Sequence, residues 1–169
     1  MIRISLSIWS GLCQLGFAIG SLPHVAVARD LVLNDADRLA VLEAAGAVQR
    51  KGMWVICADD PNTSGATIET VRDLNGDGRP EVVVTESGTF CHGHAGSGYQ
   101  LLSKQANGDW KLMSRNSGIH EFLKTRGAGG WPDILVGGPG FCFPVERWNG
   151  KAYVLHRFEY EGKRCKPQR

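Results

Sequence analysis

The sequence lacks the short motifs that assign a chemistry at once. It has no Cys-x-x-Cys pair, no Gly-x-Ser-x-Gly nucleophile motif and no phosphate-binding loop followed by a lysine. It also lacks any block of like charge, because 19 Lys and Arg residues nearly balance 17 Asp and Glu residues. A chain without a dominant charge argues against nucleic acid as a partner and against a polybasic membrane-binding surface.

The longest apolar run stands at the start of the chain. Arg3 precedes residues 4–20, which hold no acidic residue, and "AVA" at 26–28 is the small-x-small pattern that signal peptidase cuts. The run is short for a membrane-spanning helix, and charged residues follow it directly. We therefore expect a signal peptide over residues 1–28, no stable membrane span after its removal, and a periplasmic or secreted domain over residues 29–169. An uncleaved anchor is the alternative.

Four widely spaced cysteines remain once residues 1–28 are removed. An even number of cysteines in an exported chain predicts disulfides, and the wide spacing argues against zinc. Four cysteines allow three pairings. We expect Cys91 to bond Cys142 and Cys57 to bond Cys165, because Cys91 and Cys142 stand at matching places in an internal repeat.

One helix and a series of strands are predicted. Residues 34–51 have the apolar spacing and the acidic first turn of a helix, which Asn34 or Asp35 can cap. Further along, short apolar runs alternate with Gly, Pro, Asn and Asp, which is typical of antiparallel strands. The Asn-Gly steps at 107–108 and 149–150 predict two hairpins with type I′ turns, because both central residues of that turn need positive φ.

An internal repeat organises the second part of the chain. Each copy contains Gly-x-Pro-acid, a strand-like run, a glycine-rich bend, Phe-Cys and an Asn-Gly step. We expect the copies at about residues 68–115 and 120–157 of one domain. The matching segments are "GRPEVVVTESGTFC" (78–91) with "GWPDILVGGPGFC" (130–142), and "NGDWKLMSR" (107–115) with "NGKAYVLHR" (149–157).

These patterns predict a mainly β (α+β) domain. Each copy would form an antiparallel β-hairpin unit that resembles a propeller blade, yet a closed propeller needs at least about four blades. We therefore expect the two units to pack against each other and against the single N-terminal helix, with disulfides bracing them.

The segment "DLNGDGRPEVVV" (73–84) places oxygen-bearing side chains at alternate positions. Calcium takes about six to eight oxygens, and a short loop supplies them when alternate residues point inward. The twelfth position is Val84 and not the bidentate Glu of an EF-hand, so a calcium loop here belongs in a β-hairpin. The alternative is an Asx-rich turn without an ion. The predicted calcium ligands are Asp73, Asn75, Asp77, the carbonyl of Arg79, and Glu81.

The order Asp-x-Asn-x-Asp-Gly-x-x-acid before a valine run resembles the calcium turns of FG-GAP and VCBS-type repeats. The resemblance covers residues 68–86 and, as a degenerate copy without ligands, residues 120–137. In that family the turns join strands of propeller blades on extracellular proteins. The resemblance implies Ca²⁺ as a cofactor of the loop, and it implies no closed ring in a chain with two copies.

The first copy has about nine extra residues after Cys91, in "HGHAGSGYQ". An insertion in one copy of a repeat often forms a functional loop, so His92, His94 and Tyr99 are candidates for a partner-binding loop. We therefore expect an exported, calcium-stabilised, non-catalytic binding module with a protein or glycan partner in the envelope or outside the cell. The alternative is a metal-dependent hydrolase that uses His92 and His94 as zinc ligands.

Overall fold

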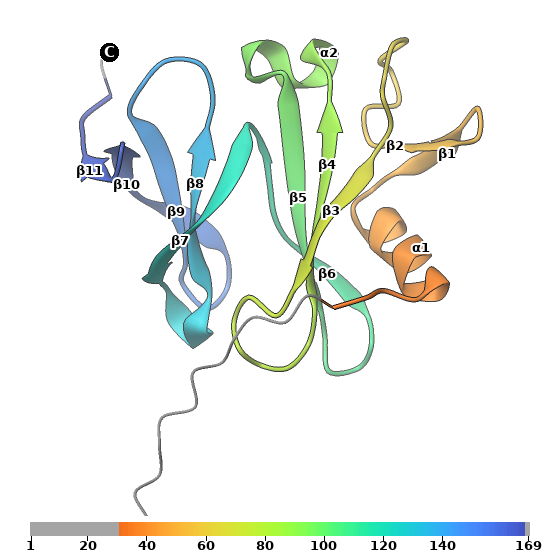
Figure 1. Ribbon diagram of the computed structural model, residues 1–169, viewed down its shortest axis with the longest axis horizontal. Helices are drawn as coiled ribbons and strands as arrows, with labels where there is room; N and C mark the ends of the chain where they lie inside the picture. Colours follow the sequence, from red (N-terminus) through yellow and green to blue (C-terminus); the bar gives the residue numbers. More distant parts are fainter. Residues whose placement is uncertain (1–30, 168–169) are drawn as a thin grey trace, which may run out of the picture.

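Three layers form residues 31–167, the part of the chain that this computed structural model describes (Figure 1). A helix and a short hairpin lie on one face of a four-stranded sheet, and a five-stranded sheet packs on its other face. The predicted signal peptide, residues 1–28, lies outside the described residues. Among the residues described, no helix is long and apolar enough to cross a membrane.

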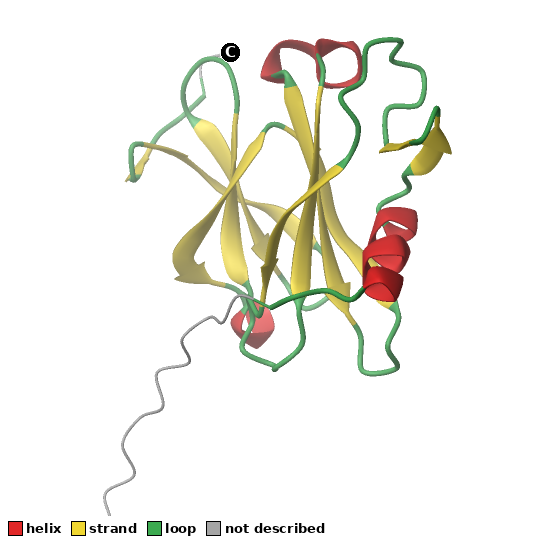
Figure 2. Ribbon diagram, turned by 45° about the vertical axis from the view of Figure 1, so that its right-hand side comes forward, coloured by secondary structure: helices red, strands yellow, loops and turns green. Residues whose placement is uncertain are grey.

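Both large sheets are antiparallel, and their strands follow chain order, as the labels of Figure 1 show; Figure 2 shows the sheets from another side. The first sheet has the order β3-β4-β5-β6, and the second has the order β7-β8-β9-β10 with β11 at its edge. The predicted mainly β class is confirmed, and the sheets do not form a closed propeller. The strands are β3 Thr67–Arg72, β4 Glu81–Ser87, β5 Ser97–Lys104, β6 Trp110–Ser117, β7 Ile119–Arg126, β8 Pro132–Gly137, β9 Phe143–Trp148, β10 Tyr153–Tyr160 and β11 Lys163–Arg164.

The longest helix is shorter than the sequence predicts. α1 spans Asp35–Ala44, and Asn34 caps it by accepting the backbone N–H of Asp37 at 2.8 Å. Gly46 has φ +82°, a left-handed conformation that ends the helix. The prediction of a helix over residues 34–51 is therefore wrong for its last part.

A small hairpin follows in place of the last helical turns. β1, Val48–Arg50, pairs with β2, Met53–Val55, through a turn at Lys51 and Gly52. The two turn residues have φ +49° and +82°, which meets the requirement of a type I′ turn. Lysine rarely takes a positive φ, so the residue type at that position did not indicate a turn.

Both predicted Asn-Gly hairpins are present, but their turns are not of type I′. Only the glycines have positive φ, +90° at Gly108 and +98° at Gly150. Each asparagine side chain accepts the backbone N–H two residues further on, from Asp109 at 3.1 Å and from Lys151 at 2.9 Å. This Asx hydrogen bond stabilises the turn while the asparagine keeps a negative φ.

Apolar cores cover both faces of the first sheet. Val83 on β4 faces the second sheet, where Trp131 lies in the same core. Val82 and Val84 point the opposite way and pack with Val41 of α1. The second sheet is different, because no described helix covers its outer face (Figure 1).

Two disulfides are formed, and the predicted pairing is wrong. Cys57 bonds Cys91 and Cys142 bonds Cys165, with Cα atoms 6.1 Å and 5.7 Å apart. Cys91 and Cys142 stand at matching places in separate units, and each bonds a cysteine that flanks its own unit. The bridges therefore fasten a flanking segment to each unit and do not join the units. Disulfides of this kind are typical of proteins in oxidising compartments.

Candidate functional site

The acidic loop, residues 73–80, joins β3 to β4 and is organised around one carboxylate. Asp73 accepts three backbone N–H groups from the loop, those of Gly76 at 2.7 Å, Asp77 at 3.2 Å and Gly78 at 2.9 Å. Gly76 and Gly78 have φ +83° and +82°, which lets the chain curl around that carboxylate. The first predicted calcium ligand therefore lies at the centre of a tight turn.

A positively charged side chain lies beside Asp77. The guanidinium of Arg79 pairs with the Asp77 carboxylate, and Asn75 Nδ2 donates to Asp77 Oδ2 at 3.0 Å. Asn75 Oδ1 accepts the Asp77 N–H at 2.9 Å. A calcium ion bound through Asp77 Oδ2 would compete with the Arg79 guanidinium for that oxygen.

Glu81, the ninth position of the predicted calcium loop, is turned into the core. Its side chain is fully buried and accepts the Leu74 N–H at 2.8 Å and the Ser103 hydroxyl at 2.9 Å. Burial and the nearby Asp77 and Asp73 carboxylates raise the pKa of Glu81 to about 7 in spite of these hydrogen bonds. Glu81 is thus held by the Leu74 N–H and by Ser103 on β5.

The loop fits calcium only in part. Oxygens of Asp73, Asn75 and Asp77 lie on one turn, whereas Glu81 is held by other partners. Calcium takes about six to eight oxygens, so main-chain carbonyls and water would have to supply the remainder. Within residues 31–167, no group of three or more Asp, Glu, His or Cys side chains is placed to hold a metal ion.

The second unit has Asp133 where the first has Glu81. Asp133 is fully buried and accepts two hydrogen bonds from Arg147 at 2.8 Å, one from Arg157 at 2.7 Å and one from Thr125 at 2.6 Å. Burial alone would raise the pKa of this carboxyl, but the hydrogen bonds from both arginines and the threonine outweigh it. They hold the pKa of Asp133 well below its usual range.

The loops at the two equivalent places touch each other. Gly130, in the 3₁₀ turn η2 (Ala128–Gly130), lies so close to Asn75 that a Cβ there would be 2.7 Å from the Asn75 carbonyl oxygen. Arg126 at the end of β7 donates to the Leu74 carbonyl at 2.8 Å and to the Gly130 carbonyl. The second unit therefore supports the acidic loop and does not repeat it.

Residues 89–95, which include the first residues of the insert, fold as a helical cap at one end of the first sheet, and the insert ends within β5 (Figure 1). The cap consists of α2, Thr89–His92, and the 3₁₀ turn η1, Gly93–Ala95. The Cys57–Cys91 disulfide ties it to the segment after β2. The cap is therefore fastened to the body of the protein.

Within the cap, His92 has a structural contact. Its Nδ1 lies 3.1 Å from the Ser117 hydroxyl, and its ring lies over Gly98, where any side chain would collide with it. Its Nε2 is buried and has no hydrogen-bond partner among the residues described. His92 is thus packed on β5 and β6, which leaves it little freedom to share an ion with His94.

The three predicted partner-loop residues differ in exposure. His94 is exposed and His92 is half-buried, but Tyr99 is fully buried between the sheets. The prediction that Tyr99 contacts a partner is therefore wrong, because the alternation along β5 turns it inward. The sequence reasoning also missed Phe90, which is 63% exposed on the cap. Its position directly before Cys91 was the available signal.

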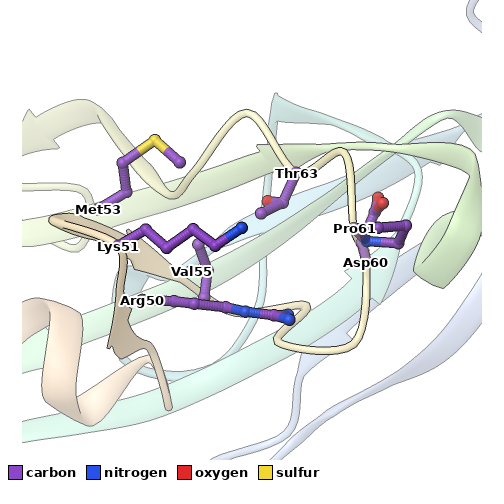
Figure 3. Close-up of a pocket in the computed structure, with 7 residues that line it drawn as sticks. All are labelled: Arg50, Lys51, Met53, Val55, Asp60, Pro61 and Thr63. Atoms are coloured by element: carbon purple, nitrogen blue, oxygen red, sulfur yellow. The ribbon is translucent and has the colours of Figure 1, made fainter.

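Two hollows in the surface differ in charge. A hollow of about 120 Å³ lies between the β1–β2 hairpin, with Arg50 and Lys51, and the loop that carries Asp60 and Thr63 (Figure 3). Its loop side is already engaged, since Asp60 accepts a backbone N–H and Thr63 donates to Glu86. A larger cavity of about 440 Å³ lies on the outer face of the second sheet and is lined by acidic and apolar side chains.

Comparison with known proteins finds no matching family model, no similar curated protein and no similar solved structure.

Proposed function

We propose that the protein is an exported, non-catalytic interaction module whose acidic loop takes up calcium. The observation that carries the proposal is the cap at residues 89–95, which only one of the two units has. It is held by a disulfide and displays two exposed side chains, Phe90 with 63% exposure and His94. An exposed aromatic side chain on a fixed element is a typical anchor of a protein interface.

Calcium at the acidic loop is supported by the crowding of carboxylates there. Asp73 and Asp77 help to raise the pKa of Glu81, which means that the three carboxylates repel one another and that a cation would relieve the repulsion. The resemblance to FG-GAP and VCBS-type turns points in the same direction. Bound calcium would be held by the side chains of Asp73, Asn75 and Asp77 and by the Arg79 carbonyl, with an affinity of about 10⁻⁴–10⁻³ M.

Export to the periplasm or to the medium is supported by the two disulfides. A protein or glycan of the envelope or of the extracellular space would then be the partner.

Thermal melting tests the calcium part of the proposal. Calcium in the millimolar range should raise the melting temperature, and Asp77→Ala should abolish the rise. Asp109→Ala is the matched control, because Asp109 stands in another exposed Asn-Gly turn. A protein that calcium does not stabilise has no ion at the loop. Stabilisation by zinc that is lost in His92→Ala/His94→Ala would support the hydrolase alternative.

Affinity capture from envelope extract tests the interaction part. A partner recovered with the wild-type chain should be lost with Phe90→Ser and retained with Leu39→Ser. Leu39 is the matched control, because it is an apolar residue of α1 with 45% exposure. Equal recovery of the partner with both variants would mean that the cap is not part of the interface.

A further inference from the structure

The outer face of the second sheet carries the larger cavity, which the proposed function does not use. The cavity has a volume of about 440 Å³ and lies on strands β7 to β10 and the turn after β10. Small-ligand and side-chain pockets in proteins commonly have about 300–1,000 Å³. The register places opposite residues on one face, since Glu121 pairs with Leu135 and Phe143 pairs with Glu159.

The apolar part of the cavity has an aliphatic floor and an aromatic wall. Leu123 and Leu135 form the floor, and Phe143 and Tyr160 form the wall. The Tyr160 ring lies 6.0 Å from that of Phe143 and 5.7 Å from that of Phe141. Phe141 lies outside the cavity lining and is 47% exposed, so the aromatic surface continues past the cavity.

The second disulfide holds this aromatic wall in place. Cys142 stands between Phe141 and Phe143 and bonds Cys165, which follows β11. The backbone N–H of Cys165 also donates to the Phe158 carbonyl at 3.1 Å. The wall is therefore fixed before a ligand arrives, which lowers the entropy cost of binding.

The charged part of the cavity is entirely acidic. Glu121, Glu159 and Glu161 line it, and its lining contains no Lys, Arg or His. Arg157 pairs with Glu159, but it also donates to Asp133. In the part of the chain that the structure describes, Glu121 and Glu161 form no ion pair. Two carboxylates thus line the cavity without an ion pair, and the basic residues Lys163 and Arg164 of β11 lie opposite Tyr160 and Glu159 just outside the lining.

We propose that this cavity, with the adjoining Phe141, docks an extended segment of a partner protein that carries Lys or Arg between apolar side chains. A cation between Tyr160 and the free carboxylates gains both ring and charge interactions. Leu123 and Leu135 would take the neighbouring apolar side chain. The continuation of the aromatic surface over Phe141 suits an extended segment better than a small amine. The inference goes beyond the proposed function, because this surface lies on the unit without the cap.

Fluorescence anisotropy of a labelled peptide tests the proposal, with the full disulfide-bonded protein. The probe is Leu-Lys-Leu-Lys-Leu-Lys, and the comparison peptides replace every Lys by Glu or every Leu by Gly. Only the probe should bind. Glu121→Gln/Glu161→Gln should weaken its binding about five- to tenfold, and Glu43→Gln, an exposed acid on α1, should not.

Tyr160→Ser supplies a second variant that does not depend on charge. Tyr160 is 39% exposed, so its replacement leaves the core intact, and probe binding should weaken about threefold or more. Amide chemical-shift changes on titration should map to residues 119–123, 135, 143 and 159–162. Binding that is indifferent to these substitutions, or that shifts the cap and not the cavity, overturns the proposal. Binding of octyltrimethylammonium without the peptide also overturns it in favour of a small cationic ligand.

Discussion

Glu81 and Asp133 occupy the same place in the two units and have opposite electrostatic surroundings. Each is fully buried at the start of a central strand. Asp133 has two arginines and keeps its charge, whereas Glu81 has a hydroxyl, a backbone N–H and two further carboxylates nearby. One unit neutralises its buried acid from within, and the other leaves that acid in need of a proton or a cation.

This difference separates the roles of the two loops. The second unit lacks the acidic side chains of the loop. Its Gly130 packs against Asn75, and its Arg126 donates a hydrogen bond to the Leu74 carbonyl. It supports the acidic loop, and its own buried carboxylate, Asp133, is already paired with arginines. The acidic loop of the first unit instead places Asp73 and Asp77 on a preformed turn near the buried Glu81. One copy thus balances its buried acid within the fold, and the other does not.

The largest effect should come from Asp133→Ala. The substitution would leave Arg147 and the buried Arg157 without their shared carboxylate, and breaking a buried ion pair by removing one partner costs about 3–5 kcal/mol. Urea unfolding should show the loss in free energy of unfolding. Asp109→Ala, at an exposed turn, is the control and should change it little. A loss below about 1 kcal/mol for Asp133→Ala would contradict the charge balance inferred for the second unit.

Glu81→Gln should reveal the opposite behaviour of the first unit. The folded-state pKa of Glu81, about 7, lies above its ordinary value of 4.5, so the fold favours the protonated form. The contribution of this group is fully present below pH 4.5 and is lost as pH rises through 7. The variant should match the wild type at low pH and exceed its stability by about 3 kcal/mol above pH 8.

Calcium sharpens the same measurement. An ion near Asp73 and Asp77 offsets the repulsion on Glu81, so calcium should reduce the loss of wild-type stability at high pH. It should stabilise Glu81→Gln less. Unfolding curves at pH 5 and 8, with calcium and with chelator, provide the comparison. A wild type whose stability does not fall between these pH values has no raised pKa at Glu81.

Gly130→Ala tests the contact between the two loops. Gly130 has φ +78°, and a Cβ there meets the Asn75 carbonyl oxygen at 2.7 Å, so the substitution should cost about 2–3 kcal/mol. Gly129→Ala is the matched control, because Gly129 has φ +60° but its Cβ would meet nothing closer than Trp131 at 3.6 Å. It should cost only about 1 kcal/mol. Equal losses of stability in the two variants would mean that the close approach of Gly130 to Asn75 contributes nothing to the cost of the substitution.

The sequence was sufficient for the mainly β class and for the place of the two Asn-Gly hairpins, but not for their turn type. Alternation of apolar runs with Gly, Pro, Asn and Asp is a local property, and it predicted the mainly β class and both Asn-Gly hairpins. The alignment of Glu81 with Asp133 was also visible in the repeat. Local pattern failed at residues 48–51, because a left-handed Gly46 and a turn at Lys51 stop a helix that the apolar spacing favours.

Other features depend on which strands become neighbours. Arg147 and Arg157 reach Asp133 only because β9 lies beside β8 and β10 beside β9. The disulfide prediction relied on repeat symmetry. Each of the two repeat cysteines, Cys91 and Cys142, instead bonds a cysteine in a segment that flanks its own unit. The acidic cavity is lined by residues from four strands and one turn, so no short stretch of the sequence predicts it.

The smallest effect should come from Arg79→Ala, which removes the cation that lies beside the acidic loop. The Arg79 side chain is 41% exposed, so loss of its pair with Asp77 should cost at most about 1 kcal/mol. The freed Asp77 carboxylate should raise calcium affinity about threefold, as isothermal titration can measure. Arg38→Ala, at an exposed position on α1, is the control. An unchanged or weaker calcium affinity in Arg79→Ala would mean that Arg79 does not compete with the ion for Asp77. The carboxylates of the first unit would then need no cation, as in the second unit.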